Sequence, residues 1–349
     1  MSRVAAVRRH ARLLIVLAVA ATLAVPIIVG GRDALTHALS LPVRTYLVLF
    51  WVIAASWCAR ALKLHLLLAQ LSLRPRFTHT LAASLAIDFA FISTPAGVGG
   101  YAACIYYLRR SGASIGAATT LAAADQILDL TFFALVLPLA GILLLWSELP
   151  HALAMLAFST GAMMISGGIV VLLARRRIGA WLLGENALVR RWPALRRRQH
   201  IVREFLAGVD ANTRLLLAGG PRSIAAIALL TAVQWLTRYG VLWVALALLG
   251  HRLSFALTLL LQSLILHAAM WTGVPAGGGG AELGLSAALS PWVPAADIAT
   301  ALLLWRLATF DACLLVGGIA IVAMTRLRHP AQAHVVELAD AAPTGKARG

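Results

Sequence analysis

The residues of this chain that could do chemistry are charged side chains embedded in long apolar stretches. Arg60, Arg238 and Arg306 are the clearest of them, and each lies in a different apolar segment. A charged side chain at membrane depth costs at least about 2.5 kcal/mol on insertion scales, so it should face a protein interior. A guanidinium group matches two phosphate oxygens at once. Three arginines around one interior would bind a phosphate, and we predict that role for them.

Acidic residues occur in the same apolar segments. Asp125 and Asp129 are four residues apart and share one face of a helix, and Glu282 follows a run of glycines. We expect these carboxylates to pair with the arginines or to take up protons, unless the pairs are static and only hold helices together. We expect Lys63 to snorkel at the inner interface and His267 to be a hydrogen-bonded core side chain. Other ionisable residues in apolar segments are His65, Asp88 and Asp311.

No metal or cofactor motif accompanies these charges. The sequence has no HExxH pair, no His–Cys cluster and no aspartate-rich loop with metal-ligand spacing. We therefore expect neither a metal ion nor another cofactor. Cys58, Cys104 and Cys313 all lie inside apolar segments, so we expect buried thiols and no disulfide framework.

Two similar glycine runs interrupt apolar segments and must break any helix that enters them. One reads Pro-Ala-Gly-Val-Gly-Gly and the other Pro-Ala-Gly-Gly-Gly-Gly, at a spacing of 275 − 95 = 180 residues. Glycine and proline are the poorest helix formers, and a broken backbone in lipid is tolerated only where protein or a water-filled cavity satisfies it. Such breaks in matching halves point to a transporter-type site. The positions that we assign to the candidate site here are Pro95, Gly97, Gly99, Gly100, Pro275, Gly277, Gly278, Gly279 and Gly280.

A second correspondence extends the repeat beyond the glycine runs. Trp57 and Arg60 match Trp235 and Arg238 at an offset of 235 − 57 = 178 residues. Three membrane crossings separate the two copies, and an odd number inverts the second copy. We therefore predict an inverted repeat whose two hairpins enter from opposite faces and meet near the midplane. The alternative is that the glycines only allow close helix packing, but packing faces space small residues at every fourth position.

Composition identifies the class of protein that contains these elements. The chain has 349 residues, of which 61% are hydrophobic and 12% charged, with a mean hydropathy of +0.86. We predict an all-α polytopic membrane protein with about six full transmembrane helices and two re-entrant helical hairpins. The net charge of +17 indicates membrane topology and anionic lipid, because the arginines stand between apolar spans and no nucleic-acid motif is present. We expect no nucleic-acid partner.

The predicted organisation is one transmembrane domain, 1–326, and a disordered tail, 327–349. Basic residues before the first span and after the last place both termini in the cytoplasm; a signal peptide is the alternative for the N-terminal apolar run. Repeat one covers about 45–146, a basic cytoplasmic loop 175–222, and repeat two about 223–325. The loop interleaves arginines with apolar residues, which favours helices on the inner leaflet over a solvated linker. The predicted spans are 13–29, 45–69, 115–146, 152–174, 223–249 and 296–324.

The second glycine run and the arginine after it resemble a known family. That family has a Pro-Gly-Gly-x-Gly pattern followed by an acidic residue and then an arginine-bearing helix, and Pro275 to Glu282 with Arg306 is similar. The first copy has Tyr101 and Gln126 where the glutamate and arginine would stand. Over about 13–324 the chain resembles the flippase-like transmembrane domain of lysylphosphatidylglycerol synthases and their stand-alone relatives.

The resemblance implies movement of a polar or charged lipid between the leaflets of a bacterial inner membrane. The lysyl-transferring members carry a soluble synthetase domain, and we expect none here, so we expect a flippase-like carrier and no aminoacyl transfer. Two alternatives stay open. One is a membrane-embedded enzyme acting on a lipid phosphate or glycolipid, and the other is a non-transporting partner that recruits a cytosolic lipid synthase through 175–222.

Overall fold

The computed structural model describes residues 33–145, 151–183, 207–270 and 272–326, together with residues 24 and 28, and these residues form no strand. Within them, four helical stretches are long and apolar enough to cross a membrane. They are α2 (Val43–Gln70), α5 (Ile115–Leu145), α9 (Gly220–Leu248) and the stretch Ala295–Met324. The protein is therefore an all-α polytopic membrane protein, as its composition predicts.

Two of the six predicted spans are not among these four. The span predicted at 13–29 lies almost wholly outside the described residues, as does the tail 327–349. The span predicted at 152–174 lies in α6 (His151–Leu183), a helix of 33 residues. Residues 33–40, between the first two predicted spans, are helical. Of the basic loop 175–222, the described ends are helical up to Leu183 and over residues 207–218.

Both glycine runs break a helix where the sequence predicts, and each break joins two short helices. The first hairpin consists of α3 (Phe77–Ile92), the turn η1 (Pro95–Gly97) and α4 (Val98–Arg110). The second consists of α10 (Phe255–Met270), the turn η2 (Pro275–Gly277) and α11 (Gly280–Leu289). The longest of these helices has 16 residues, and at 1.5 Å per residue it reaches about 24 Å, less than the roughly 30 Å of a bilayer core.

The last span is continuous but changes its helical form in the middle. It consists of α12 (Ala295–Arg306), a π-helical turn η3 (Leu307–Asp311) and α13 (Ala312–Arg326). Such π turns insert an extra residue into a helix and are frequent at functional sites. Here the turn follows Arg306 directly. In contrast, α5 is one helix over its whole length, although Pro138 lies inside it.

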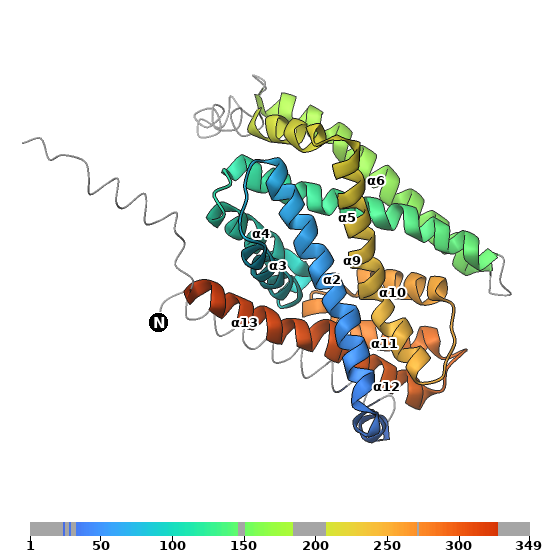
Figure 1. Ribbon diagram of the computed structural model, residues 1–349. Helices are drawn as coiled ribbons and strands as arrows, with labels where there is room; N and C mark the ends of the chain where they lie inside the picture. Colours follow the sequence, from blue (N-terminus) through green and yellow to red (C-terminus); the bar gives the residue numbers. More distant parts are fainter. Residues whose placement is uncertain are drawn as a thin grey trace, which may run out of the picture.

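The two halves pack around each other in a reciprocal way. Helices α2 and α9 lie side by side and run in opposite directions (Figure 1). The hydroxyl of Ser56 donates to the carbonyl of Gln234 at 2.8 Å, and these residues are 178 positions apart, the offset of the repeat. The turns η1 and η2 also contact each other. Equivalent residues meet only near an axis that relates the copies, so these contacts support the inverted repeat that we propose.

Each hairpin packs against the last span of the other half. Helix α3 packs against α13, and α10 packs against α5. Large apolar side chains such as Leu135 on α5, Leu229 on α9 and Leu315 on α13 remain more than 60% exposed. A surface in contact with water rarely exposes so many large apolar side chains. These exposed side chains fit a surface in contact with lipid.

The second hairpin should be sensitive to any side chain at Gly277. This glycine has φ +64°, and a Cβ there would lie 2.7 Å from the Cβ of Ala269. Because of the left-handed backbone and the clash, we expect Gly277→Ala to lower the free energy of unfolding by about 2 kcal/mol. Thermal unfolding of the purified protein measures this. Gly167→Ala is the control, since nothing lies within 4 Å of a Cβ there, and an unchanged Gly277→Ala variant would contradict the turn geometry.

Candidate functional site

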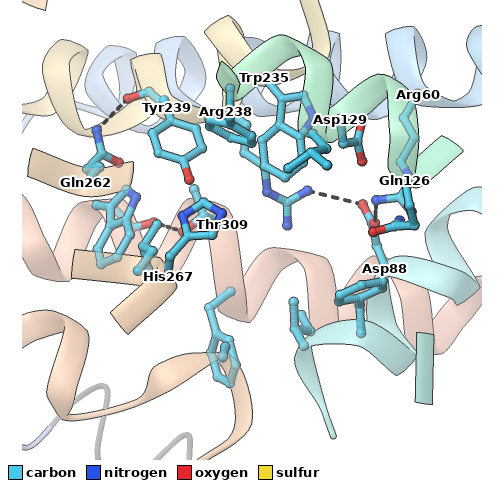
Figure 2. Close-up of a pocket in the computed structure, with 18 of the residues that line it drawn as sticks. Arg60, Asp88, Gln126, Asp129, Trp235, Arg238, Tyr239, Gln262, His267 and Thr309 are labelled. Carbon is cyan, nitrogen blue, oxygen red and sulfur yellow. Dashed lines mark hydrogen bonds and ion pairs between the residues drawn. The ribbon is translucent and has the colours of Figure 1, made fainter. Parts of the chain in front are cut away.

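A cavity of about 430 Å³ lies where the two halves meet. Helices of both repeats line it, and Figure 2 shows charged and uncharged side chains around it. Asp129, Asp88 and Arg60 lie on one side, and Tyr239 and His267 lie on the other (Figure 2). A volume of this size is within the range of small-molecule sites, about 300 to 1,000 Å³. The cavity therefore suits a compact polar group.

Two arginines from different repeats converge on one carboxylate in the cavity wall. Arg60 on α2 pairs through Nη1 with Oδ1 of Asp88, and Arg238 on α9 donates from Nη1 to Oδ2 of Asp88 at 3.2 Å. Arg60 and Arg238 are equivalent at the 178-residue offset. The Asp88 side chain is only 2% exposed. The sequence placed Asp88 among the ionisable residues but gave no sign that it joins both arginines, because α3 is far from α9 in the chain.

A second group of charges lies behind the first. Lys63 Nζ is 2.6 Å from Oδ1 of Asp125 and 3.0 Å from Oδ1 of Asp129, which also accepts from Trp235 Nε1 at 2.9 Å. The expectation that Lys63 snorkels to the interface is wrong, since its side chain is fully buried. The two aspartates share a helix face as predicted. Lys63 is three residues after Arg60, so both lie on one face of α2. This spacing was the sequence signal that Lys63 belongs to the same buried network.

Glu282 and Arg306 form a third pair, and this pair holds the second turn. Arg306 Nε lies 2.6 Å from Oε1 of Glu282, and the guanidinium donates to the carbonyl of Ala276 from Nη1 at 3.3 Å and from Nη2 at 3.4 Å. Glu282 Oε2 accepts from the amide of Gly279 at 2.8 Å. Ala276 has φ +50°, a strained value for a residue with a side chain. The ion pair thus fixes both ends of a turn that the backbone alone would not favour.

The first turn is held by uncharged groups. The amide of Gly99, which corresponds to Gly279 at 279 − 99 = 180, donates to Oγ1 of Thr94 at 2.9 Å. Tyr101 donates its hydroxyl to Oε1 of Gln126, the counterpart of Arg306, at 3.0 Å. The two departures from the family pattern therefore meet in a hydrogen bond. The sequence did not indicate this role for Thr94, because a threonine beside a proline is not a specific pattern for a hydrogen-bond acceptor in a turn.

Aromatic rings form part of the cavity wall. The ring of Phe133 lies 4.9 Å from that of Trp235, 5.5 Å from Tyr239 and 5.2 Å from His267. His267 Nδ1 is 2.6 Å from the carbonyl of Ser263, so this histidine is hydrogen-bonded as expected, and it also lines the cavity. A cavity lined by both charged side chains and aromatic rings matches an amphiphilic molecule.

The structure gives the predicted site residues different positions. Arg60, Arg238, Arg306 and Asp129 line the cavity, whereas Asp125 and Glu282 pair with those that do. In the described part of the chain, no proline or glycine of the two glycine runs lines the cavity. The residue of these runs that does line it is Ala276. The side chains of Arg60 and Arg238 are 12% and 17% exposed, compared with 3% for Arg306. Arg60 and Arg238 are therefore the arginines that a ligand can reach.

These features define a polytopic α-helical membrane protein with two broken hairpins around a charged cavity. The model of the lysylphosphatidylglycerol synthase TM region family matches residues 11–317, and the chain belongs to this family. It is also similar to a UPF0104 membrane protein of Archaeoglobus fulgidus. The two are 24% identical over 288 residues, which cover 79% of this chain and 85% of the archaeal protein.

The buried ionic network predicts that replacing Lys63 lowers the stability of the protein. Lys63→Met would leave Asp125 and Asp129 without their shared cation, and breaking a buried pair costs about 3 to 5 kcal/mol. We expect a loss of that size in unfolding experiments on the purified protein. Asp129→Asn introduced into Lys63→Met should restore part of it, because one carboxylate fewer is then left unpaired.

Arg110→Met is the control for Lys63→Met. The Arg110 guanidinium only contacts the half-exposed Tyr106 ring, and its loss should cost less than about 1 kcal/mol. Wild-type stability of Lys63→Met would show that the buried pairs are not maintained in the protein.

Proposed function

We propose that this protein moves a lipid with a polar or anionic phosphate headgroup between the leaflets of a bacterial inner membrane. The observation that carries the proposal is the pair Arg60 and Arg238, one from each repeat, which converge inside the cavity. Guanidinium groups bind phosphate oxygens through paired, charge-assisted hydrogen bonds. A site built by both repeats at their contact is the arrangement that alternating-access carriers use.

The residues that line the cavity support a lipid headgroup as the occupant. In the proposal, the headgroup phosphate enters between Arg60 and Arg238, and the acyl chains stay in the surrounding lipid. Trp235 and Phe133 would contact the apolar part nearest the headgroup. The pair Glu282–Arg306 would keep the second turn in position while the headgroup passes. Membership of the family is consistent with a lipid substrate.

The positions of the helix ends support hairpins that enter from opposite faces. The ends of hairpin one lie near the start of α9: Gln70 donates to Ser223 at 2.5 Å, and a Cβ at Gly112 would lie 3.8 Å from Leu73. This end carries Arg74, Arg76, Arg109, Arg110 and Arg222. The loop before α10 and the start of α12 meet through His251 and Asp297, 2.8 Å apart. Since arginines concentrate on the cytoplasmic side, we assign hairpin one to that side, with both chain termini there.

The test is leaflet exchange in proteoliposomes that contain a fluorescent phosphatidylglycerol and a membrane-impermeant quencher. We expect exchange with the wild-type protein, none above background in empty vesicles, and at least about a tenfold slower rate for Arg238→Gln. The reason is the loss of a charged hydrogen bond worth about 1.5 to 3 kcal/mol, where 1.4 kcal/mol is tenfold.

Arg252→Gln is the matched control for Arg238→Gln. Arg252 is an exposed arginine in the loop between α9 and α10, outside the cavity lining. The Arg252→Gln variant should exchange lipid at the wild-type rate. Equal rates in wild-type and empty vesicles for phosphatidylglycerol would refute translocation of this lipid, and equal rates for Arg238→Gln and wild type would remove the arginine pair from the mechanism.

A further inference from the structure

We propose that Asp88 is an internal substitute for the headgroup phosphate, a carboxylate that occupies the two-arginine site until an anionic headgroup displaces it. This inference rests on the proposed function for the nature of the ligand, and it concerns how the same site is filled and emptied. The structure shows the arginines occupied by an anion that belongs to the protein itself.

The geometry of Asp88 is that of a bound ligand. Each of its oxygens contacts one guanidinium, Oδ1 with Arg60 and Oδ2 with Arg238, as a phosphate would with two of its oxygens. Asp88 comes from α3, whereas the arginines come from α2 and α9. Asp88 lines the cavity together with both arginines (Figure 2). A phosphate that enters the cavity therefore reaches the same donors.

The other carboxylates of the network are held by different groups. Asp129 is bound by Lys63 and by the indole of Trp235, and Asp125 is bound by Lys63 at 2.6 Å with only a longer contact of 3.7 Å to Arg60. Among the described residues, Asp88 is thus the acid whose two oxygens are both committed to the arginines of the cavity. Displacement of an anion from this site would act on Asp88 first.

Charge balance gives the competition its direction. Arg60, Lys63 and Arg238 face Asp88, Asp125 and Asp129, three cations and three carboxylates. With the network neutral, a phosphate and the Asp88 carboxylate cannot both be paired by the same two guanidinium groups without repulsion between them. Entry of the headgroup therefore requires Asp88 to leave. Its return supplies the counter-ion that lets the headgroup go.

Displacement of Asp88 would also release the first hairpin. Asp88 is the charged contact that joins α3 to both α2 and α9. Loss of these contacts would leave α3 held by its packing against α13 and α2 and by the contact of Thr80 with His65 at 3.3 Å. Binding of a headgroup would in this way allow the first hairpin to move. The second turn would stay fixed by Glu282 and Arg306.

The test measures binding of dihexanoyl phosphatidylglycerol, a water-soluble anionic lipid, to the purified full chain by calorimetry. We expect Asp88→Asn to bind it at least about tenfold more tightly than wild type, because the competing carboxylate is gone and two buried guanidinium groups need an anion. Asp297→Asn makes the same change in net charge but lies outside the cavity lining, where Asp297 pairs with His251, and it should change affinity by less than about threefold. Arg238→Gln should bind at least about tenfold more weakly.

The outcomes separate the possibilities. Unchanged or weaker binding by Asp88→Asn would overturn the inference, and so would equal tightening by Asp297→Asn, since net charge alone would then explain the effect. Should Asp88→Asn not fold, the double variant Asp88→Asn with Arg60→Gln, which removes one charge of each sign, takes its place. It should bind the lipid more tightly than Arg60→Gln alone, and equal binding by the two would overturn the inference.

Leaflet exchange distinguishes this inference from the proposed function. With the inference correct, Asp88→Asn binds the probe more tightly but exchanges lipid more slowly than wild type, because no internal anion expels the headgroup. Exchange by wild type without tighter binding by Asp88→Asn would leave the function standing and remove the role of Asp88. Tighter binding without exchange by wild type would keep the anion site and remove translocation.

Discussion

Pairing of buried charges is the constraint on which the rest of this structure depends. An isolated ion in an apolar interior is strongly disfavoured, and its cost is offset only when an opposite charge lies within hydrogen-bonding distance. Here the partners come from different segments: α2 supplies Arg60 and Lys63, α3 supplies Asp88, α5 supplies the two aspartates and α9 supplies Arg238. The helices can satisfy these charges only in one mutual arrangement. The ionic network therefore specifies the packing as well as the site.

The same principle explains the contrast between the two turns. Both turns place a glycine amide at an equivalent position, and both satisfy it with a side-chain oxygen. In the second turn that oxygen belongs to Glu282, whose negative charge requires Arg306. In the first turn it belongs to Thr94, and the adjoining helix makes an uncharged hydrogen bond from Tyr101 to Gln126. The halves share a backbone plan but differ in polarity, so they make unequal contributions to the cavity.

Sequence patterns predicted the helices and the breaks well, because apolar length and runs of glycine and proline act locally. The limits of α2, α5 and α9 differ from prediction by only a few residues. The arginines and acids were also recognisable, since charge in an apolar segment is conspicuous. Their partners were not, because the pairing of Asp88 with Arg238 or of Lys63 with Asp125 depends on tertiary contacts between distant segments. Lys63 was misplaced for the same reason: its position in the chain suggested an interface, and two aspartates on another helix draw it inward.

The reciprocal packing of the hairpins has a consequence for biosynthesis. Hairpin one packs against α13, the last described helix of the chain, and its Asp88 pairs with an arginine of the second half. When the first half leaves the ribosome, neither partner has yet been made, so α3 enters the membrane without its final neighbour. Until α9 and α13 are inserted, Arg60 is the one of the two arginines that Asp88 can pair with. Assembly of the cavity is thus the closing step of membrane insertion, and a chain cut short before α13 would leave hairpin one without the surface that it covers.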